Sequence, residues 1–120
     1  MHGDQGAIVG QFPKPGDMAV MVDDVFTDGH TKIESIDLVN KLCKINFSGV
    51  IVALDRMERS SRGEDAIAEF ILKTGVPVWS IINIREVCIY LKNRTVNGNV
   101  MLSDALYNEI EQYLEEHNIR

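Results

Sequence analysis

The sequence predicts a three-layer α/β domain built on an open parallel sheet. Three short runs rich in valine and isoleucine, residues 18–24, 49–55 and 76–82, alternate with amphipathic segments. Continuously apolar strands of this kind are typical of parallel sheets that helices cover on both faces. The length of 120 residues and a hydrophobic content of 45% suit one domain with an ordinary core.

The segments between and after these runs carry helical spacing. The predicted helices lie within residues 30–45, 64–75, 83–93 and 102–118. Ser103 is placed to cap the last of them, with an acid in its first turn. Residues 93–99 are predicted to be a loop that joins the last two helices. Strands that alternate with helices in this way pair in parallel through right-handed crossovers.

Composition and charge exclude several classes of function. A formal net charge of −6 argues against a general electrostatic grip on nucleic acid or on an anionic membrane. No apolar run approaches the roughly 20 residues of a membrane span, and no leader precedes the domain, so we expect a cytoplasmic protein. Cys43 and Cys88 lack CxxC spacing and are expected to be reduced thiols in apolar surroundings.

The stretch "VMVDDVFTDGHT", residues 20–31, suggests a binding site. Asp23 and Asp24 are predicted to end the first strand, and residues 25–31 to form the loop into the first helix. Ligands of open parallel sheets bind at this end of the strands, and helix N-terminal amides suit a phosphate. Carboxylates can accept hydrogen bonds from sugar hydroxyls or hold Mg²⁺ through water. Alternatively, Thr27 or Asp28 only caps the helix; spacing alone leaves both readings open.

The residues of this stretch resemble the signature of the type I phosphoribosyltransferases, in which an apolar strand, two acids and a loop of threonine and glycine follow one another. The stretch "VALDRMERSSRGEDAIAEF", residues 52–70, is similar to the LDR-x-E strand end of orotate phosphoribosyltransferases. Residues 75–91, "GVPVWSIINIREVCIYL", look like the next strand and helix of that family. "HGDQGAIVG", residues 2–10, is similar to the segment where the family's mobile catalytic loop closes.

This resemblance implies transfer of ribose 5-phosphate from phosphoribosyl pyrophosphate to orotate, which gives orotidine monophosphate and pyrophosphate, with Mg²⁺ as cofactor. It implies that Asp23 and Asp24 act in catalysis, facing the ribose hydroxyls and a magnesium-bound water, and that Thr27 and Arg56 contact orotate. The residues implied to bind phosphoribosyl pyrophosphate are His2, Asp23, Asp24, Val25, Phe26, Thr27, Asp28, Gly29, His30 and Thr31.

Three of these residues also have plainer readings. The forked donors of Arg56 suit a planar carboxylate, but without the family an arginine paired with a nearby glutamate or aspartate is favoured. Asp28 and His30 stand where the family has small or hydroxyl residues. An acid there repels a phosphate unless it accepts backbone amide bonds as a cap, and a loop histidine is more often solvated.

The resemblance covers the carboxyl-terminal part of the family's fold, with residues 1–18 as the remnant of the catalytic loop and its return. We therefore expect residues 1–120 to form a single domain with little or no activity alone. The acid-pair strand is expected to be a sheet edge, which predicts a homodimer or completion by an amino-terminal half. The alternatives are a noncatalytic binder of phosphoribosyl pyrophosphate or a nucleotide, and a flavodoxin-like or receiver-like domain whose acids bind only a metal.

Overall fold

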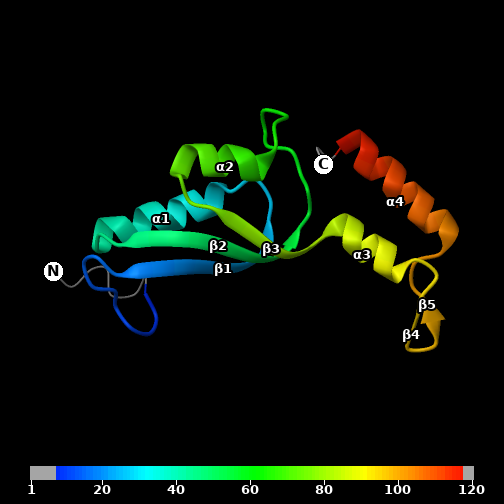
Figure 1. The fold of residues 1–120 in the computed structure, drawn as a ribbon, viewed down its shortest axis with the longest axis horizontal. Helices are drawn as coiled ribbons and strands as arrows, with labels where there is room; N and C mark the ends of the chain where they lie inside the picture. The colour runs from blue at the N-terminus through cyan, green and yellow to red at the C-terminus, as the bar shows by residue number, and fades with distance from the viewer. Residues whose placement is uncertain (1–7, 118–120) are drawn as a thin grey trace.

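A three-stranded parallel sheet forms the centre of the computed structural model, which describes residues 8–117. The strands β1 (Met18–Phe26), β2 (Asn46–Asp55) and β3 (Val78–Asn83) lie in the order β1-β2-β3 (Figure 1). Helices α1 (His30–Leu42) and α2 (Ala66–Thr74) make the two crossovers. The predicted α/β class with a parallel sheet is confirmed.

The main core lies between this sheet and the two crossover helices, which lie on the same face of it (Figure 1). Val50 and Val52 in the central strand are fully buried. The rings of Phe26 and Phe70 meet edge to face, with centroids 5.5 Å apart, and so join the end of β1 to α2. This contact fixes where the loop that follows β1 leaves the sheet.

Strand β1 continues beyond the acid pair, which corrects the predicted strand end. Val25 pairs with Leu54 of β2 and Phe26 pairs with Asp55, so Asp23 and Asp24 lie within the strand. Valine and phenylalanine favour extended backbone, and burial of the Phe26 ring stabilises the extra pairing. The loop before α1 is consequently only residues 27–29.

The second face of the sheet is not covered by the described residues. Five large apolar side chains on it are 49% to 78% exposed: Met18, Val20, Val22, Trp79 and Ile81. The register places Val22 beside Ile51 and Ile51 beside Trp79, so these side chains line up across all three strands. The described part of the chain therefore forms two layers, a sheet and one layer of helices.

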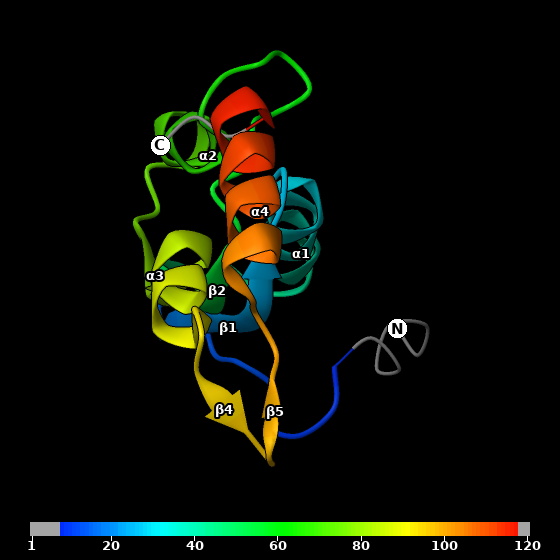
Figure 2. The ribbon, with the colours of Figure 1, turned by 90° about the vertical axis from the view of Figure 1, so that its right-hand side faces the viewer.

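The chain after β3 extends away from the sheet, which gives principal extents of 58 × 35 × 23 Å (Figures 1 and 2). Helix α3 (Ile84–Leu91) is joined to α4 (Asp104–His117) by an ion pair at 3.0 Å between Arg85 and Glu111. The predicted cap is confirmed, because the hydroxyl oxygen of Ser103 accepts a 3.3 Å hydrogen bond from the Leu106 amide.

Two further sequence expectations have an outcome in this part of the structure. Residues 93–99 are not a plain loop, because β4 (Thr95–Val96) and β5 (Asn99–Val100) form a hairpin. Cys88 is buried, Cys43 is partly buried, and both are free thiols as predicted. Between residues 8 and 117, no helix is long and apolar enough to cross a membrane.

Candidate functional site

The acid pair near the end of β1 is divided between two environments. Asp23 lies under α1, where the Nζ of Lys32 donates a 2.9 Å hydrogen bond to its Oδ2. Successive residues of a strand point to opposite faces, which directs Asp24 away from α1 and toward the uncovered side. The Asp24 carboxylate is exposed and accepts a 2.7 Å bond from the Val25 amide. Of the two acids, Asp24 is the more available to a ligand.

Lys32 is a buried charged residue beside the acid pair that sequence reasoning missed. Only 4% exposed, it donates from Nζ to the Val25 carbonyl at 2.9 Å as well as to Asp23, and it lies 5.1 Å from the centroid of the Phe26 ring. The hydrogen bond from Lys32, with a further bond from the Asp24 amide, holds the pKa of Asp23 below its usual value. One signal could have found Lys32: it stands four residues before Ile36, on the apolar stripe of α1.

The loop between β1 and α1 is built around Gly29. Its φ of 76° lies in the left-handed region, and a Cβ there would stand 2.8 Å from the Phe26 ring, so this position requires glycine. The Asp28 Oδ1 accepts a 3.0 Å hydrogen bond from the His30 amide, whereas the N-cap position of α1 is Gly29, which has no side chain to cap the helix. His30 turns outward to Glu34, with 3.3 Å between Nε2 and Oε1. An anion bound at this amide would displace, or lie beside, the Asp28 carboxylate.

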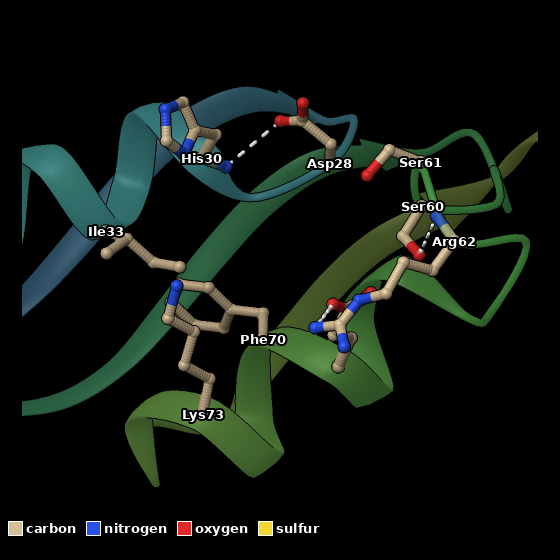
Figure 3. Close-up of a pocket in the computed structure, with 9 residues that line it drawn as sticks. Asp28, His30, Ile33, Ser60, Ser61, Arg62, Phe70 and Lys73 are labelled. Carbon is tan, nitrogen blue, oxygen red and sulfur yellow. Dashed lines mark hydrogen bonds and ion pairs between the residues drawn. The ribbon is translucent and has the colours of Figure 1, made fainter.

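A hollow of about 270 Å³ adjoins this loop (Figure 3). It opens between the start of α1 and the loop after β2, and its polar lining consists of Asp28, His30, Ser60, Ser61, Arg62, Glu69 and Lys73. Arg62 is paired with Glu69. A hydrogen bond from Ser60, followed by the bond from Arg62, keeps the pKa of Glu69 low. Arg62 and Lys73 can donate hydrogen bonds to an anionic group in this hollow, but Asp28 and Glu69 in the same lining balance their charge.

Arg56 does not line this hollow. Its Nη2 lies 2.5 Å from the Glu58 Oε1, so the pairing with a neighbouring acid that the sequence favoured is present. The arginine borders a second hollow of about 500 Å³ that has mainly apolar walls, among them Leu54, Ile84 and Tyr113. The polar groups in its lining are Arg56, its partner Glu58 and His117, so a planar molecule could lie against the apolar walls with its polar end toward Arg56.

The remaining predicted site residues are placed as follows. Thr27 lies in the loop, Thr31 lies in the first turn of α1, and Val25 and Phe26 end β1, where only the backbone of the buried Phe26 can face a ligand. His2 lies outside the described residues. No group of three or more histidine, cysteine or acidic side chains in residues 8–117 is arranged to hold a metal. The acid pair suits Mg²⁺ only if substrate oxygens and water complete the octahedral shell.

Comparisons with known proteins bear on the family and the fold of the chain. No family model matches the chain. It is 31% identical over 119 residues to an orotate phosphoribosyltransferase of Clostridium acetobutylicum, covering 99% of this chain and 53% of that protein. Against the orotate phosphoribosyltransferase of Marinobacter nauticus, identity is 41% over 92 residues, which cover 77% of this chain and 42% of that protein.

Two solved structures are similar in fold. The orotate phosphoribosyltransferase of Francisella tularensis superposes with a TM-score of 0.64 at 21% identity, covering 85% of this chain and 47% of that one. For Leishmania donovani UMP synthase the TM-score is 0.68 at 22% identity, with 96% of this chain and 23% of that one covered. The chain spans about half the length of the curated relatives it matches. The predicted family resemblance is confirmed, as is its restriction to part of a larger fold.

Proposed function

Since nearly the whole chain is homologous to about half of the orotate phosphoribosyltransferases, we propose that it provides the phosphoribosyl pyrophosphate site of such an enzyme. The reaction is transfer of ribose 5-phosphate to orotate, which yields orotidine monophosphate and pyrophosphate in the cytoplasmic synthesis of UMP. One observation carries the proposal. The acid pair and the glycine loop lie together at the carboxyl end of β1, beside the first turn of α1.

The proposed roles follow from the environment of each residue. Asp24, exposed and without a cationic partner in the hydrogen bonds given above, accepts from the ribose hydroxyls, while Asp23 is held under α1 by Lys32. Thr27, Thr31 and the first-turn amides of α1 receive the 5-phosphate. Positive charge that develops on the ribose is stabilised by the nearby carboxylates. Mg²⁺, when bound through substrate and water, neutralises charge on the leaving pyrophosphate.

Arg56 is proposed to bind the orotate carboxylate at the mouth of the second hollow. This role requires its contact with Glu58 to be exchanged for, or shared with, the ligand. Arg56 is about half exposed, so this exchange does not open a buried ion pair. The second hollow then receives the pyrimidine ring, because its apolar walls exclude water from a planar face.

A noncatalytic module that binds phosphoribosyl pyrophosphate or a nucleotide is a second candidate. The Asp28 carboxylate favours it, because a negative charge at the His30 amide opposes tight binding of a phosphate.

Titration calorimetry tests the proposal. We expect saturable binding of phosphoribosyl pyrophosphate that requires Mg²⁺, and binding of orotidine monophosphate in preference to other nucleoside monophosphates. Absence of binding by every one of these ligands would contradict it. Formation of orotidine monophosphate from phosphoribosyl pyrophosphate and orotate, measured by product chromatography, then separates the enzyme from the binding module. The isolated chain is expected to bind weakly and turn over little.

A further inference from the structure

The turn at the end of β2 holds Met57 in a backbone conformation that a methionine disfavours. Its φ is 57°, in the left-handed region. Among the described residues, the other non-glycine residues with positive φ are Asn93 and Asn97, and asparagine tolerates this region because its short side chain can form a local hydrogen bond. A methionine side chain forms no such bond. The structure around Met57 must therefore hold it in this conformation.

Two buried groups hold this turn. The Asp55 Oδ1 accepts a 2.7 Å hydrogen bond from the Met57 amide, which is the local bond of an Asx turn. Asp55 is itself only 5% exposed and ends the central strand, where it is paired with Phe26 of β1 and Asn83 of β3. The Met57 side chain is 7% exposed, so it anchors the other end of the turn. The residue between these two anchors is Arg56.

We propose that Asp55 and Met57 are positioning residues for Arg56, and that their turn thereby sets the preference for a pyrimidine that carries a carboxylate. Arg56 borders the hollow of about 500 Å³, and its side chain is about half exposed. Met57 stands between Arg56 and Glu58 in the chain, so its backbone also determines whether those two side chains meet, with 2.5 Å between Nη2 and Oε1. The inference rests on the role proposed for Arg56 and adds the residues through which that role is exerted.

The strain at Met57 favours a positioning role over a role in packing alone. Glycine adopts a positive φ without steric cost, so a turn that only redirects the chain does not require methionine. Strained backbone persists where its surroundings over-determine it, and it clusters at ligand-binding sites. An arginine that is already held in its binding geometry loses less conformational entropy when its forked donors engage a carboxylate. A more mobile turn would keep the charge of Arg56 and lose this advantage.

Orotidine monophosphate and uridine monophosphate give a direct test, because they differ only in the ring carboxylate. Their affinities for the full chain are measured by titration calorimetry. Met57→Gly removes the buried anchor and relieves the strain, and Asp55→Ala removes the acceptor of the amide bond. Each should lower the ratio of the two affinities by about tenfold, through weaker binding of orotidine monophosphate. The affinity for uridine monophosphate should change by less than about twofold.

Conservative variants and a matched control separate positioning from a general loss of structure. Asp55→Asn keeps an oxygen that accepts the amide bond, and Met57→Leu keeps an apolar anchor, so both should retain the affinity ratio within about twofold. Asn97→Gly relieves a positive φ in the hairpin of β4 and β5 and should leave the ratio unchanged. Urea unfolding identifies the variants that are folded. Met57→Gly is decisive, because glycine favours the observed φ and so keeps the turn accessible.

A second measurement needs no ligand. The Nε–Hε resonance of Arg56, assigned with Arg56→Lys, reports the environment of the guanidinium and should shift or broaden in Met57→Gly. An affinity ratio that is unchanged in Met57→Gly would overturn the inference and leave the proposed function standing. Equal affinity of the unsubstituted chain for the two nucleotides would instead refute the role proposed for Arg56. In that case a changed resonance would still support the positioning of Arg56 by the turn, and an unchanged one would overturn it.

Discussion

Replacing Lys32 with methionine should remove a defined electrostatic contribution to stability. The substitution keeps the length and apolar packing of the side chain and deletes the charge that lies 2.9 Å from Asp23. At that distance and an effective dielectric constant of 20, the Coulomb energy is about 6 kcal/mol. Burial of the ammonium and the 45% exposure of the Asp23 side chain reduce this greatly, so we expect a net coupling of about 1–2 kcal/mol.

The assay is a double-mutant cycle of Lys32→Met and Asp23→Asn, followed by urea unfolding at several pH values. The folded-state pKa of Asp23 is depressed, so its contribution is present above the unfolded pKa and is lost as the pH falls through the folded value. The coupling should therefore be full at pH 7 and should disappear progressively below about pH 4. Lys41→Met on the exposed end of α1 is the matched control. A coupling below about 0.3 kcal/mol at pH 7, or one unchanged by acid, would refute the reasoning.

Three further expectations concern the loop and the acid pair. Asp24→Asn should weaken magnesium-dependent binding of phosphoribosyl pyrophosphate more than Asp23→Asn does, and calorimetry showing the reverse order would contradict the division of roles. Asp28→Ser keeps an oxygen that can accept the bond from the His30 amide and removes a negative charge that repels the phosphate by about 1 kcal/mol. The affinity for phosphoribosyl pyrophosphate should therefore rise roughly fivefold. An unchanged or lower affinity would contradict this repulsion. Gly29→Ala should cost about 2–4 kcal/mol in urea unfolding, from left-handed strain and a clash with a buried ring. A Cβ at Gly98 would meet open space, so Gly98→Ala should lower the free energy of unfolding by only about 1–2 kcal/mol. Equal losses of stability in the two variants would exclude the clash at Gly29.

The fold was predictable where local pattern and tertiary environment agree. The apolar run of residues 49–55 is the centre of β2, and Gly75 ends α2 in the left-handed conformation that a helix C-terminus favours. The end of β1 was placed too early because a pair of acids is a strong local signal for a strand end. The contact of Phe26 with Phe70, 44 positions later in the chain, overrides that signal and is invisible in a local window.

Two other differences had signals in the sequence. Asn97 and Gly98 both have positive φ, 50° and 80°, as a tight hairpin turn requires, and an Asn-Gly pair is the strongest short-range sign of one. Lys32 lies on the apolar stripe of α1, where a charged residue calls for a buried partner. Its partner, Asp23, could not be identified from spacing, because the crossover from strand to helix determines which acid the ammonium reaches.

The division of the acid pair and the uncovered face have one physical cause. Side chains alternate along a strand, so Asp24 points to the same side as Val22, and Asp23 points to the side of α1 and Lys32. A layer that covers Val22 must therefore also approach Asp24. Exclusion of water from this side would strengthen the hydrogen bonds of Asp24 to a ribose hydroxyl. Lys32 keeps the neighbouring Asp23 paired, so such a change at Asp24 leaves no second carboxylate unpaired beside it.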